Sequence, residues 1–446
     1  MTNVSKKQKD KAPILSYLLM GWGNLRAGQI VRGILYLLLE IAFLVFMVTT
    51  GARSLQGLIT LGTNQQGMVF NEEIGIYERI DGDNSMLLLL GGVVTLFVIV
   101  FFLIMYFISI RSGAEALARK AAGKHPATFR DDIRSLANGN IHKLLLAIPL
   151  GGLVIFTVMP LVYMILMAFT NYDVNHQPPG NLFDWVGMAN FKTLLASSDK
   201  LSQTFWPILG WTAVWAVFAT FTNYFLGMFL AILINNKGIK GKKIWRTIFV
   251  LTIAIPSFVS LLVIRTMLNK NGVINTQLIE LGFITQPLPF LTNANWARVT
   301  VIVANMWIGI PYTMLITTGI LTNIPADLYE SAKMDGAGPV TTFRKITFPY
   351  IFFITTPYLI SNFIANVNNF NPIYFLTEGG PLTLDYFKGA GKTDLLVTWL
   401  YKLTKDSMDY NYAAAIGIVI FVISASISIL VYTRSGAFKN EEGFQL

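Results

Sequence analysis

The sequence contains no cysteine, only three histidines and few charged residues. Without cysteine, the chain has no disulfide framework, thiolate nucleophile or sulfur ligand for a metal ion. The histidines, His125, His142 and His176, are scattered without the spacing of metal ligands, so we expect no metal site. Charged residues form 13% of the chain and hydrophobic residues 54%, which is unlike a soluble globular domain and predicts a chain embedded in a bilayer.

Long apolar stretches recur along the chain, and few of them carry a charge near the centre. About eight of them are long enough to cross roughly 30 Å of hydrocarbon. We predict membrane-spanning helices at residues 33–50, 86–110, 143–170, 204–234, 244–268, 298–321, 350–376 and 411–432. The predicted fold class is therefore all-α, a polytopic membrane bundle of about eight transmembrane helices.

The basic residues lie between the predicted spans rather than along one groove. Although the formal charge is +10, this pattern does not suit nucleic-acid binding. With the N-terminus in the cytoplasm, 23 of the 34 Lys and Arg residues fall on the cytoplasmic side, as the positive-inside rule expects. Polar residues interrupt the first apolar stretch and no small-residue cleavage site follows, which predicts an uncleaved cytoplasmic start. An even number of spans then returns the C-terminus to the cytoplasm.

The order of spans and loops predicts three parts of the chain. Residues 1–142 form an N-terminal segment with two transmembrane helices and an external loop. Residues 143–434 form a core of about six spans with a cytoplasmic loop at 323–349, and residues 435–446 form a cytoplasmic tail. No segment fits a separate water-soluble enzyme domain, so we expect no catalytic residues.

The cytoplasmic loop 323–349 has the local signals of a helix, a turn and a second helix. Pro325 suits a first helical turn, Gly336 can adopt the left-handed conformation that ends a helix, and Pro339 can begin a second short helix that finishes near Pro349. Apolar side chains and an acidic end would lie on different faces of the first helix, which suits docking into the cleft of a partner. An ordinary amphipathic loop is the alternative.

Two predicted spans carry a stripe of neutral polar residues. Asn305, Gly309 and Tyr312 share one helical face with Ile308 beside them, and the same spacing relates Asn362, Asn366 and Asn369. Stripes without carboxylates or bases favour a ligand that is polar but uncharged, such as a sugar. Amide groups can pair with hydroxyls, a tyrosine ring can cover the apolar face of a pyranose, and a glycine allows close approach. The alternative is that these asparagines join neighbouring helices by hydrogen bonds.

These motifs resemble those of binding-protein-dependent ABC importers. The cytoplasmic loop is similar to their coupling motif, a Glu-Ala-Ala triplet followed by Gly and ending in Ile-x-x-Pro, with Glu330, Ser331, Ala332, Gly336, Ile346 and Pro349 at its positions. Ser331 replaces the middle alanine. The stretches 305–312 and 362–369 resemble those that line the sugar site of MalF-type maltose/maltodextrin permeases, with Asn362 in place of a serine. The resemblance covers roughly residues 211–432.

The resemblance implies a permease subunit of an ATP-driven sugar importer in the bacterial cytoplasmic membrane. Its expected partners are a second homologous permease of the MalG type, two copies of a cytoplasmic ABC ATPase, an extracytoplasmic sugar-binding protein and a neutral oligosaccharide. ATP and Mg would bind to the ATPase, and this chain would bind no cofactor. The stripe residues would bind the substrate, and Glu330, Ser331, Ala332, Asp335, Gly336 and Pro349 would couple the chain to the ATPase.

Three alternatives stay open at this stage. The substrate could be another neutral oligosaccharide, such as a galacto-oligosaccharide, because all of them offer hydroxyl edges and apolar faces. An ion-coupled secondary transporter would usually need an acidic residue or a broken helix near midmembrane, and the prominent charged candidates, Glu40 and Arg265, do not accompany the stripes. A membrane-embedded hydrolase would need paired carboxylates. Gly391-Lys392-Thr393 resembles the end of a phosphate-binding loop, but Tyr386 occupies the place of its first glycine, so ATP hydrolysis is expected in a partner chain.

Overall fold

The computed structural model describes residues 14–71, 74–196, 198–236 and 238–434 of the chain. The predicted cytoplasmic tail, residues 435–446, and the first 13 residues of the predicted cytoplasmic start lie outside these residues. Contacts divide the chain into two units, with the boundary between Gly187 and Met188. The division differs from the predicted boundary after residue 142, because contacts group the third predicted span with the N-terminal part of the chain.

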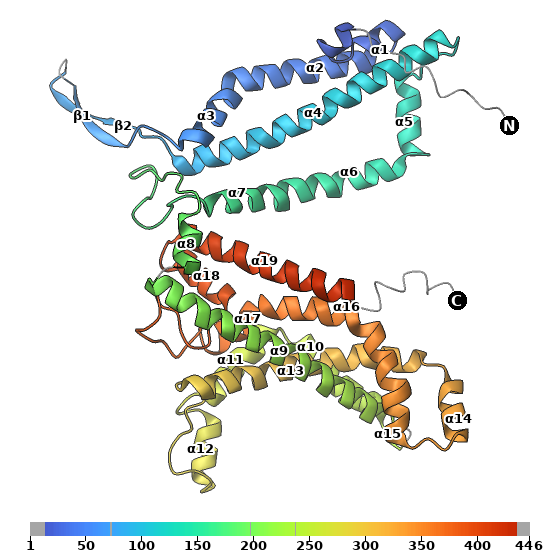
Figure 1. The fold of residues 1–446 in the computed structure, drawn as a ribbon, viewed down its shortest axis with the longest axis vertical. Coiled ribbons are helices and arrows are strands. Elements are labelled where there is room, and N and C mark those ends of the chain that lie inside the picture. Colours follow the sequence, from blue (N-terminus) through green and yellow to red (C-terminus); the bar gives the residue numbers. More distant parts are fainter. Residues whose placement is uncertain (1–13, 72–73, 197, 237, 435–446) are drawn as a thin grey trace. The chain divides into compact units, whose positions relative to one another are not determined.

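The first unit consists of apolar helices and one hairpin (Figure 1). A capped start defines its longest helix, because the Asn84 side chain accepts hydrogen bonds from the backbone N–H groups of Met86 and Leu87. Helix α4 packs along α1 and α3. The elements are η1 (Ile14–Tyr17), α1 (Trp22–Ala27), α2 (Ile30–Phe46), η2 (Met47–Gly51), α3 (Ala52–Thr60), β1 (Gly67–Asn71), β2 (Ile76–Ile80), α4 (Ser85–Ala121), α5 (Phe129–Ala137), α6 (Ile141–Leu153), η3 (Val154–Val158) and α7 (Met159–Met167).

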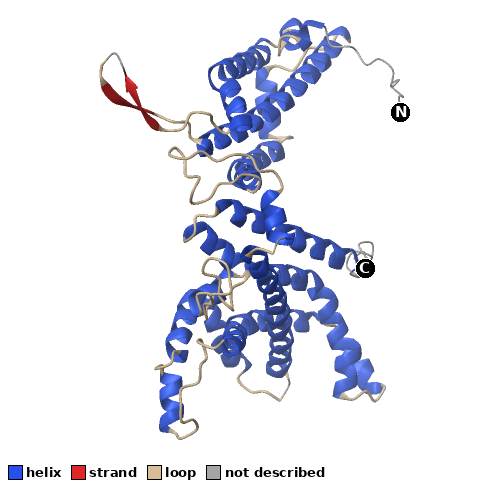
Figure 2. Ribbon diagram, turned by 60° about the vertical axis from the view of Figure 1, so that its left-hand side comes forward, coloured by secondary structure: helices blue, strands red, loops and turns tan. Residues whose placement is uncertain are grey.

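The hairpin of β1 and β2 is a feature that the spacing of apolar residues did not predict. The two strands pair antiparallel, with Gly67 opposite Ile80 and Val69 opposite Glu78. It forms the one sheet in the part of the chain that the structure describes, shown in red in Figure 2. Asp83 fixes its base, since one carboxylate oxygen accepts hydrogen bonds from the backbone N–H groups of Thr63 and Asn64.

Every regular element among the described residues of the second unit is a helix, and loops connect these helices. Helices α9 and α13 pack tightly along each other, and Trp215, Ala219 and Val301 are fully buried in the apolar core beside them. The elements are α8 (Ala189–Ala196), α9 (Lys200–Asn235), α10 (Lys242–Ala254), α11 (Ser257–Leu268), α12 (Val273–Glu280), α13 (Ala294–Asn323), α14 (Ala326–Met334), α15 (Pro339–Thr342), η4 (Phe343–Thr347), α16 (Phe348–Val367), α17 (Phe370–Leu376), α18 (Leu396–Lys405) and α19 (Tyr410–Arg434).

The number of spans agrees with the prediction. Among the described residues, 7 helices are long and apolar enough to cross a membrane, and one bent pair raises the number to 8. That pair, Lys242–Ala254 with Ser257–Glu280, corrects the expectation of one continuous helix at 244–268, because its two members are bent by 91°. The bend lies at Ile255 and Pro256. A residue before proline is driven into an extended conformation, and Ile255 has φ −84° and ψ 127°.

A second correction concerns the helix that begins at Pro339. It was expected to end near Pro349, but α15, η4 and α16 follow one another without interruption to Val367. The turn η4 is a π-helix, in which Phe348 donates its backbone N–H to the carbonyl oxygen of Phe343. The helix continues through Pro349, as α13 does through Pro311 and α16 does through Pro357. The break comes later, at Asn368 and Asn369, within the stretch predicted as one span.

Candidate substrate cavity and coupling loop

A cavity of about 380 Å³ lies among α9, α13, α16 and the bend between α10 and α11. All seven residues predicted to bind substrate line it, although their role stays a prediction: Asn305, Ile308, Gly309, Tyr312, Asn362, Asn366 and Asn369. The other lining residues are Asn223, Thr252, Ile253, Ile255, Pro256, Ser257 and Tyr358.

Helix geometry explains how residues far apart in the sequence meet here. The stripe on α13 follows the 3.6-residue period, so its members share the face that borders the cavity. Asn369 joins them because α16 ends at Val367, and the chain turns before α17 begins. Its side-chain amide donates to Asn366 Oδ1 at 3.3 Å. The bend at Pro256 brings irregular backbone to the same cavity, which is where a membrane protein tolerates it.

The lining of the cavity is polar but carries no fixed charge. It contains five asparagines, two tyrosines, one serine and one threonine, and no Asp, Glu, Lys, Arg or His. Tyr312 is 52% exposed, and its ring centroid lies 6.1 Å from that of Tyr358. The Tyr358 hydroxyl lies 3.3 Å from Thr313 Oγ1. Such a surface offers hydroxyl and amide partners to a neutral ligand, together with two aromatic rings.

Asn366 differs from the other lining asparagines because it also joins two helices. Its side chain is 5% exposed and donates through Nδ2 to Thr220 Oγ1 at 3.0 Å. Its backbone carbonyl accepts a hydrogen bond from the indole N–H of Trp215 at 3.0 Å. Both contacts connect α16 to α9. For Asn366, the alternative of an interhelical contact therefore holds alongside a place in the cavity wall.

Gly309 also has a packing reason to lack a side chain. The sequence suggested that a glycine here lets a sugar approach the backbone, and that role stays a prediction. A Cβ atom added at Gly309 would lie 2.0 Å from Nδ2 of Asn223. The missing side chain therefore makes room for Asn223 of α9 within the cavity wall.

Sequence reasoning missed several lining residues, including Asn223, Ser257 and Tyr358. A signal existed for Asn223, since it is an amide within the apolar stretch 204–234. For Ser257 no signal was available, because its position depends on the bend that follows Ile255.

The coupling loop, residues 323–349, holds α14, which projects from the rest of its unit (Figures 1 and 2). Gly336 has φ +71°, and the hydrogen bond from Ala337 N–H to the Ala332 carbonyl closes the end of α14. This confirms the expected left-handed terminus. The Tyr329 hydroxyl lies 3.1 Å from Thr347 Oγ1 and holds α14 against η4.

The surface of α14 is exposed and mixed in character. Glu330, Ser331 and Asp335 are exposed, and Ala332 is half-buried. Met334 is 89% exposed, although it is a large apolar side chain at the end of the helix. An apolar side chain beside exposed carboxylates suits contact with another protein.

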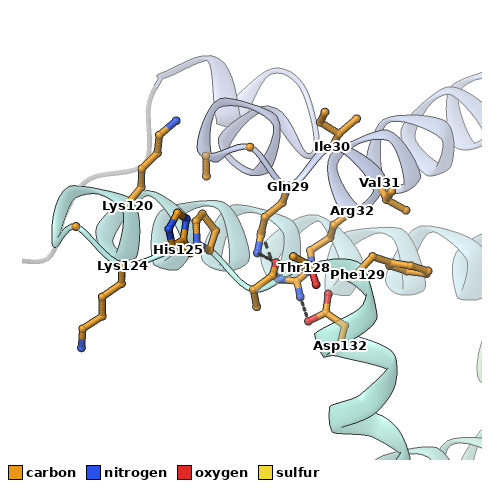
Figure 3. A pocket seen from close by; sticks show the side chains of 15 residues that line it. Gln29, Ile30, Val31, Arg32, Lys120, Lys124, His125, Thr128, Phe129 and Asp132 are labelled. Carbon is orange, nitrogen blue, oxygen red and sulfur yellow. Dashed lines mark hydrogen bonds and ion pairs between the residues drawn. The ribbon is translucent and has the colours of Figure 1, made fainter.

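A larger cavity of about 730 Å³ lies in the first unit, between the start of α2, the end of α4 and α5. Figure 3 shows Arg32 reaching Asp132, with which it forms an ion pair, while Lys120 and Lys124 point in opposite directions. Gln29 Nε2 donates to the carbonyl of Ala127 at 2.8 Å. Charged side chains form part of the lining of this larger cavity, and none of its lining residues belongs to the two stripes. Across the described residues, no group of three or more His, Cys, Asp and Glu could hold a metal ion.

Helices long and apolar enough to span a membrane, a neutral polar cavity and a protruding loop are the features of a membrane transport subunit. The chain belongs to the family described as binding-protein-dependent transport system inner membrane component, whose profile matches residues 223–434. It is thus a multi-pass permease, a transport component.

The similarity to individual members of this family extends over nearly the whole chain. The maltodextrin transport system permease protein MdxF of Bacillus subtilis is 36% identical over 98% of this chain and 98% of its own length. The galactooligosaccharides transport system permease protein GanP of the same organism is 33% identical over 97% of this chain and 100% of its own. A solved bacterial alginate ABC transporter, in complex with an alginate pentasaccharide-bound periplasmic protein, shares the fold. Its chain has a TM-score of 0.55 and 22% identity, covering 68% of this chain and 96% of its own.

Proposed function

We propose that this chain imports maltodextrin-type oligosaccharides as one permease half of an ATP-driven transporter, and that the cavity lined by Asn305 and Tyr312 lies on the sugar's path. The observation that carries the proposal is the neutral lining, in which five amides and two tyrosines occur without any Asp, Glu, Lys, Arg or His. The similarity to MdxF over 98% of both chains supports maltodextrin as the substrate class.

Different lining residues would make different kinds of contact with a sugar. Asn305 and Asn362 offer amide donors and acceptors to hydroxyl groups, because each side-chain amide can do both. Tyr312 is half-exposed, so its ring can pack on the apolar face of a pyranose. Ile308 adds apolar contact on the same helical face.

The coupling loop would transmit the state of an ATPase to this cavity. In the proposed complex, α14 sits in a cleft of a cytoplasmic ABC ATPase, which binds ATP and Mg. Because α15, η4 and α16 form one helical run from Pro339 to Val367, a movement of the loop reaches Asn362 and Asn366 directly. The contact between Tyr329 and Thr347 keeps α14 attached to η4, near the start of this helical run.

The remaining partners follow from the same proposal. A second homologous permease of the MalG type would complete the pathway, each permease would dock one of two ATPase copies, and an extracytoplasmic sugar-binding protein would deliver the sugar. The chain would lie in the bacterial cytoplasmic membrane with both termini in the cytoplasm.

The test is to purify the assembled transporter in lipid and to present its binding protein loaded with defined sugars. Maltotriose should stimulate ATP hydrolysis and enter the vesicle lumen. Galacto-oligosaccharides form the second candidate substrate, because GanP is 33% identical over 97% of this chain. Stimulation by a β-linked galactobiose and not by maltotriose would replace the maltodextrin assignment, and a complex active with this chain as its sole permease would contradict the partner assignment.

A further inference from the structure

Asn223 is a buried amide in the wall of the cavity that has no hydrogen-bond partner. It lies in the middle of α9, is 4% exposed, and its Oδ1 atom receives no hydrogen bond from any described residue. An unpaired buried carbonyl oxygen is unfavourable, and native structures rarely retain one without a reason. The position therefore calls for an explanation beyond packing.

Neighbouring polar side chains on α9 are satisfied. Thr220 accepts a hydrogen bond from Asn366, and the Tyr224 hydroxyl lies 2.7 Å from Thr355 Oγ1. These residues connect α9 to α16 as interhelical contacts do. Of the buried side chains with an unpartnered atom in the described part of the chain, Asn223 is the one that lines this cavity. Asn223 is thus not an ordinary interhelical contact.

The opposite helix is shaped to hold this amide in place. Gly309 lies across from it, and a Cβ atom there would come within 2.0 Å of Asn223 Nδ2 and 2.9 Å of its Oδ1. Gly309 belongs to the stripe of α13 that also carries Asn305 and Tyr312. The amide of Asn223 therefore lies against the same face that we propose to bind the sugar.

We propose that Asn223 is a further sugar-binding residue, whose side-chain oxygen accepts a hydrogen bond from a sugar hydroxyl and so contributes to the choice of substrate. This inference rests on the proposed function. A site built to pair with a hydroxyl discriminates against an analogue that lacks it, because the buried group is then left unpaired. Asn223 thereby adds a third helix, α9, to the polar surface formed by α13 and α16.

The experiment compares Asn223→Leu with the unmodified chain in the complete transporter, reconstituted with maltotriose-loaded binding protein. Leucine keeps the approximate shape but removes the amide, and replacing an unpaired buried polar group by an apolar one of similar shape is nearly neutral or stabilising. We expect the amount of maltotriose imported per ATP hydrolysed to fall about tenfold, while the thermal midpoint of the sugar-free complex stays equal or rises. Thr222→Ala is the matched control, since Thr222 is adjacent on α9 and bonds its own helix backbone at Phe218.

The outcomes separate this inference from the proposed function. A lower thermal midpoint with unchanged import per ATP would show a packing role and overturn the inference. If Tyr312→Ala lowers import but Asn223→Leu does not, the cavity carries sugar and the assignment of Asn223 alone is wrong. If neither variant changes import, the cavity is not on the sugar's path and the proposed function fails with it.

Discussion

The cavity and the coupling loop belong to the same unit, but their surfaces differ in chemical character. The cavity is lined by asparagines and tyrosines among other uncharged residues, and its lining contains no Asp, Glu, Lys, Arg or His. Helix α14 exposes carboxylates together with Met334, and Gly336 and one hydroxyl pair hold it in place. The first surface suits a neutral small molecule, and the second suits a protein. One helical run, from Pro339 to Val367, connects them, so changes at either end should separate sugar import from ATP use.

The largest effect is expected from Gly336→Val in the coupling loop. Gly336 has φ +71°, which a β-branched residue strongly disfavours, at a free-energy cost of about 1–2 kcal/mol or more. The turn into Pro339 would be misdirected, so stimulation of the ATPase by loaded binding protein should be lost. Gly338→Val is the matched control, because Gly338 has φ −71° and an added Cβ meets open space. Equal loss of stimulation in both variants would count against a special role of Gly336.

The next effect concerns the cavity, where Tyr312→Ala removes a half-exposed ring from α13. We expect maltotriose import to fall about tenfold, because an aromatic contact with an apolar face is lost together with its buried area. The thermal midpoint of the complex should change little. Tyr312→Phe retains the ring and should retain most import. Normal import by the alanine variant in reconstituted vesicles would remove Tyr312 from the path.

A smaller and mixed effect is expected from Asn366→Ala. This residue contacts Thr220 on α9 and also lines the cavity, so its removal should destabilise the complex by about 0.6–2 kcal/mol and lower import. Asn362→Ala is the comparison, since Asn362 is half-buried and lines the same cavity. It should lower import at an unchanged thermal midpoint. Identical melting of the two variants would show that the interhelical contact of Asn366 contributes no stability.

The sequence predicted those features that depend on spacing along one helix. Asn305, Gly309 and Tyr312 share a face because residues at i, i+4 and i+7 of one helix must do so, and the spans were recognisable from apolar length. Asn369 reaches the same cavity for a different reason, since it lies beyond the end of α16. Features that depend on contacts between helices were not predictable. The fit of Asn223 against Gly309 requires the register of α9 against α13, which no local pattern contains.

Local backbone events also escaped the sequence reasoning. Pro256 separates two helices, whereas Pro349 lies within a continuous helical run, as Pro311 lies within α13. The residue type is the same in both places, so proline alone does not decide whether a span breaks. The β1–β2 hairpin lacks the alternating burial of a packed strand, since the described side chains of both strands are exposed. An alternation of apolar and polar residues, which would predict a half-buried strand, is therefore not required of its sequence.

The smallest effect is expected at Glu378, in the loop that follows α17. Arg265 Nη1 donates to Glu378 Oε1 at 2.6 Å, and this hydrogen bond holds the pKa of the Glu378 carboxyl below its usual range. Because the folded pKa is depressed, the pair contributes stability above the ordinary glutamate pKa, and that contribution is lost as the pH falls through the lowered folded value. Both side chains are accessible to water, so Glu378→Gln should lower the free energy of unfolding by less than about 1 kcal/mol at neutral pH.

The difference in thermal midpoint between the Glu378→Gln variant and the unmodified complex should shrink on acidification below about pH 4. The difference produced by Asn366→Ala should not shrink, since amides do not titrate. A difference for Glu378→Gln that stays constant with pH would show that the ion pair contributes nothing and that the loop is held by its other contacts.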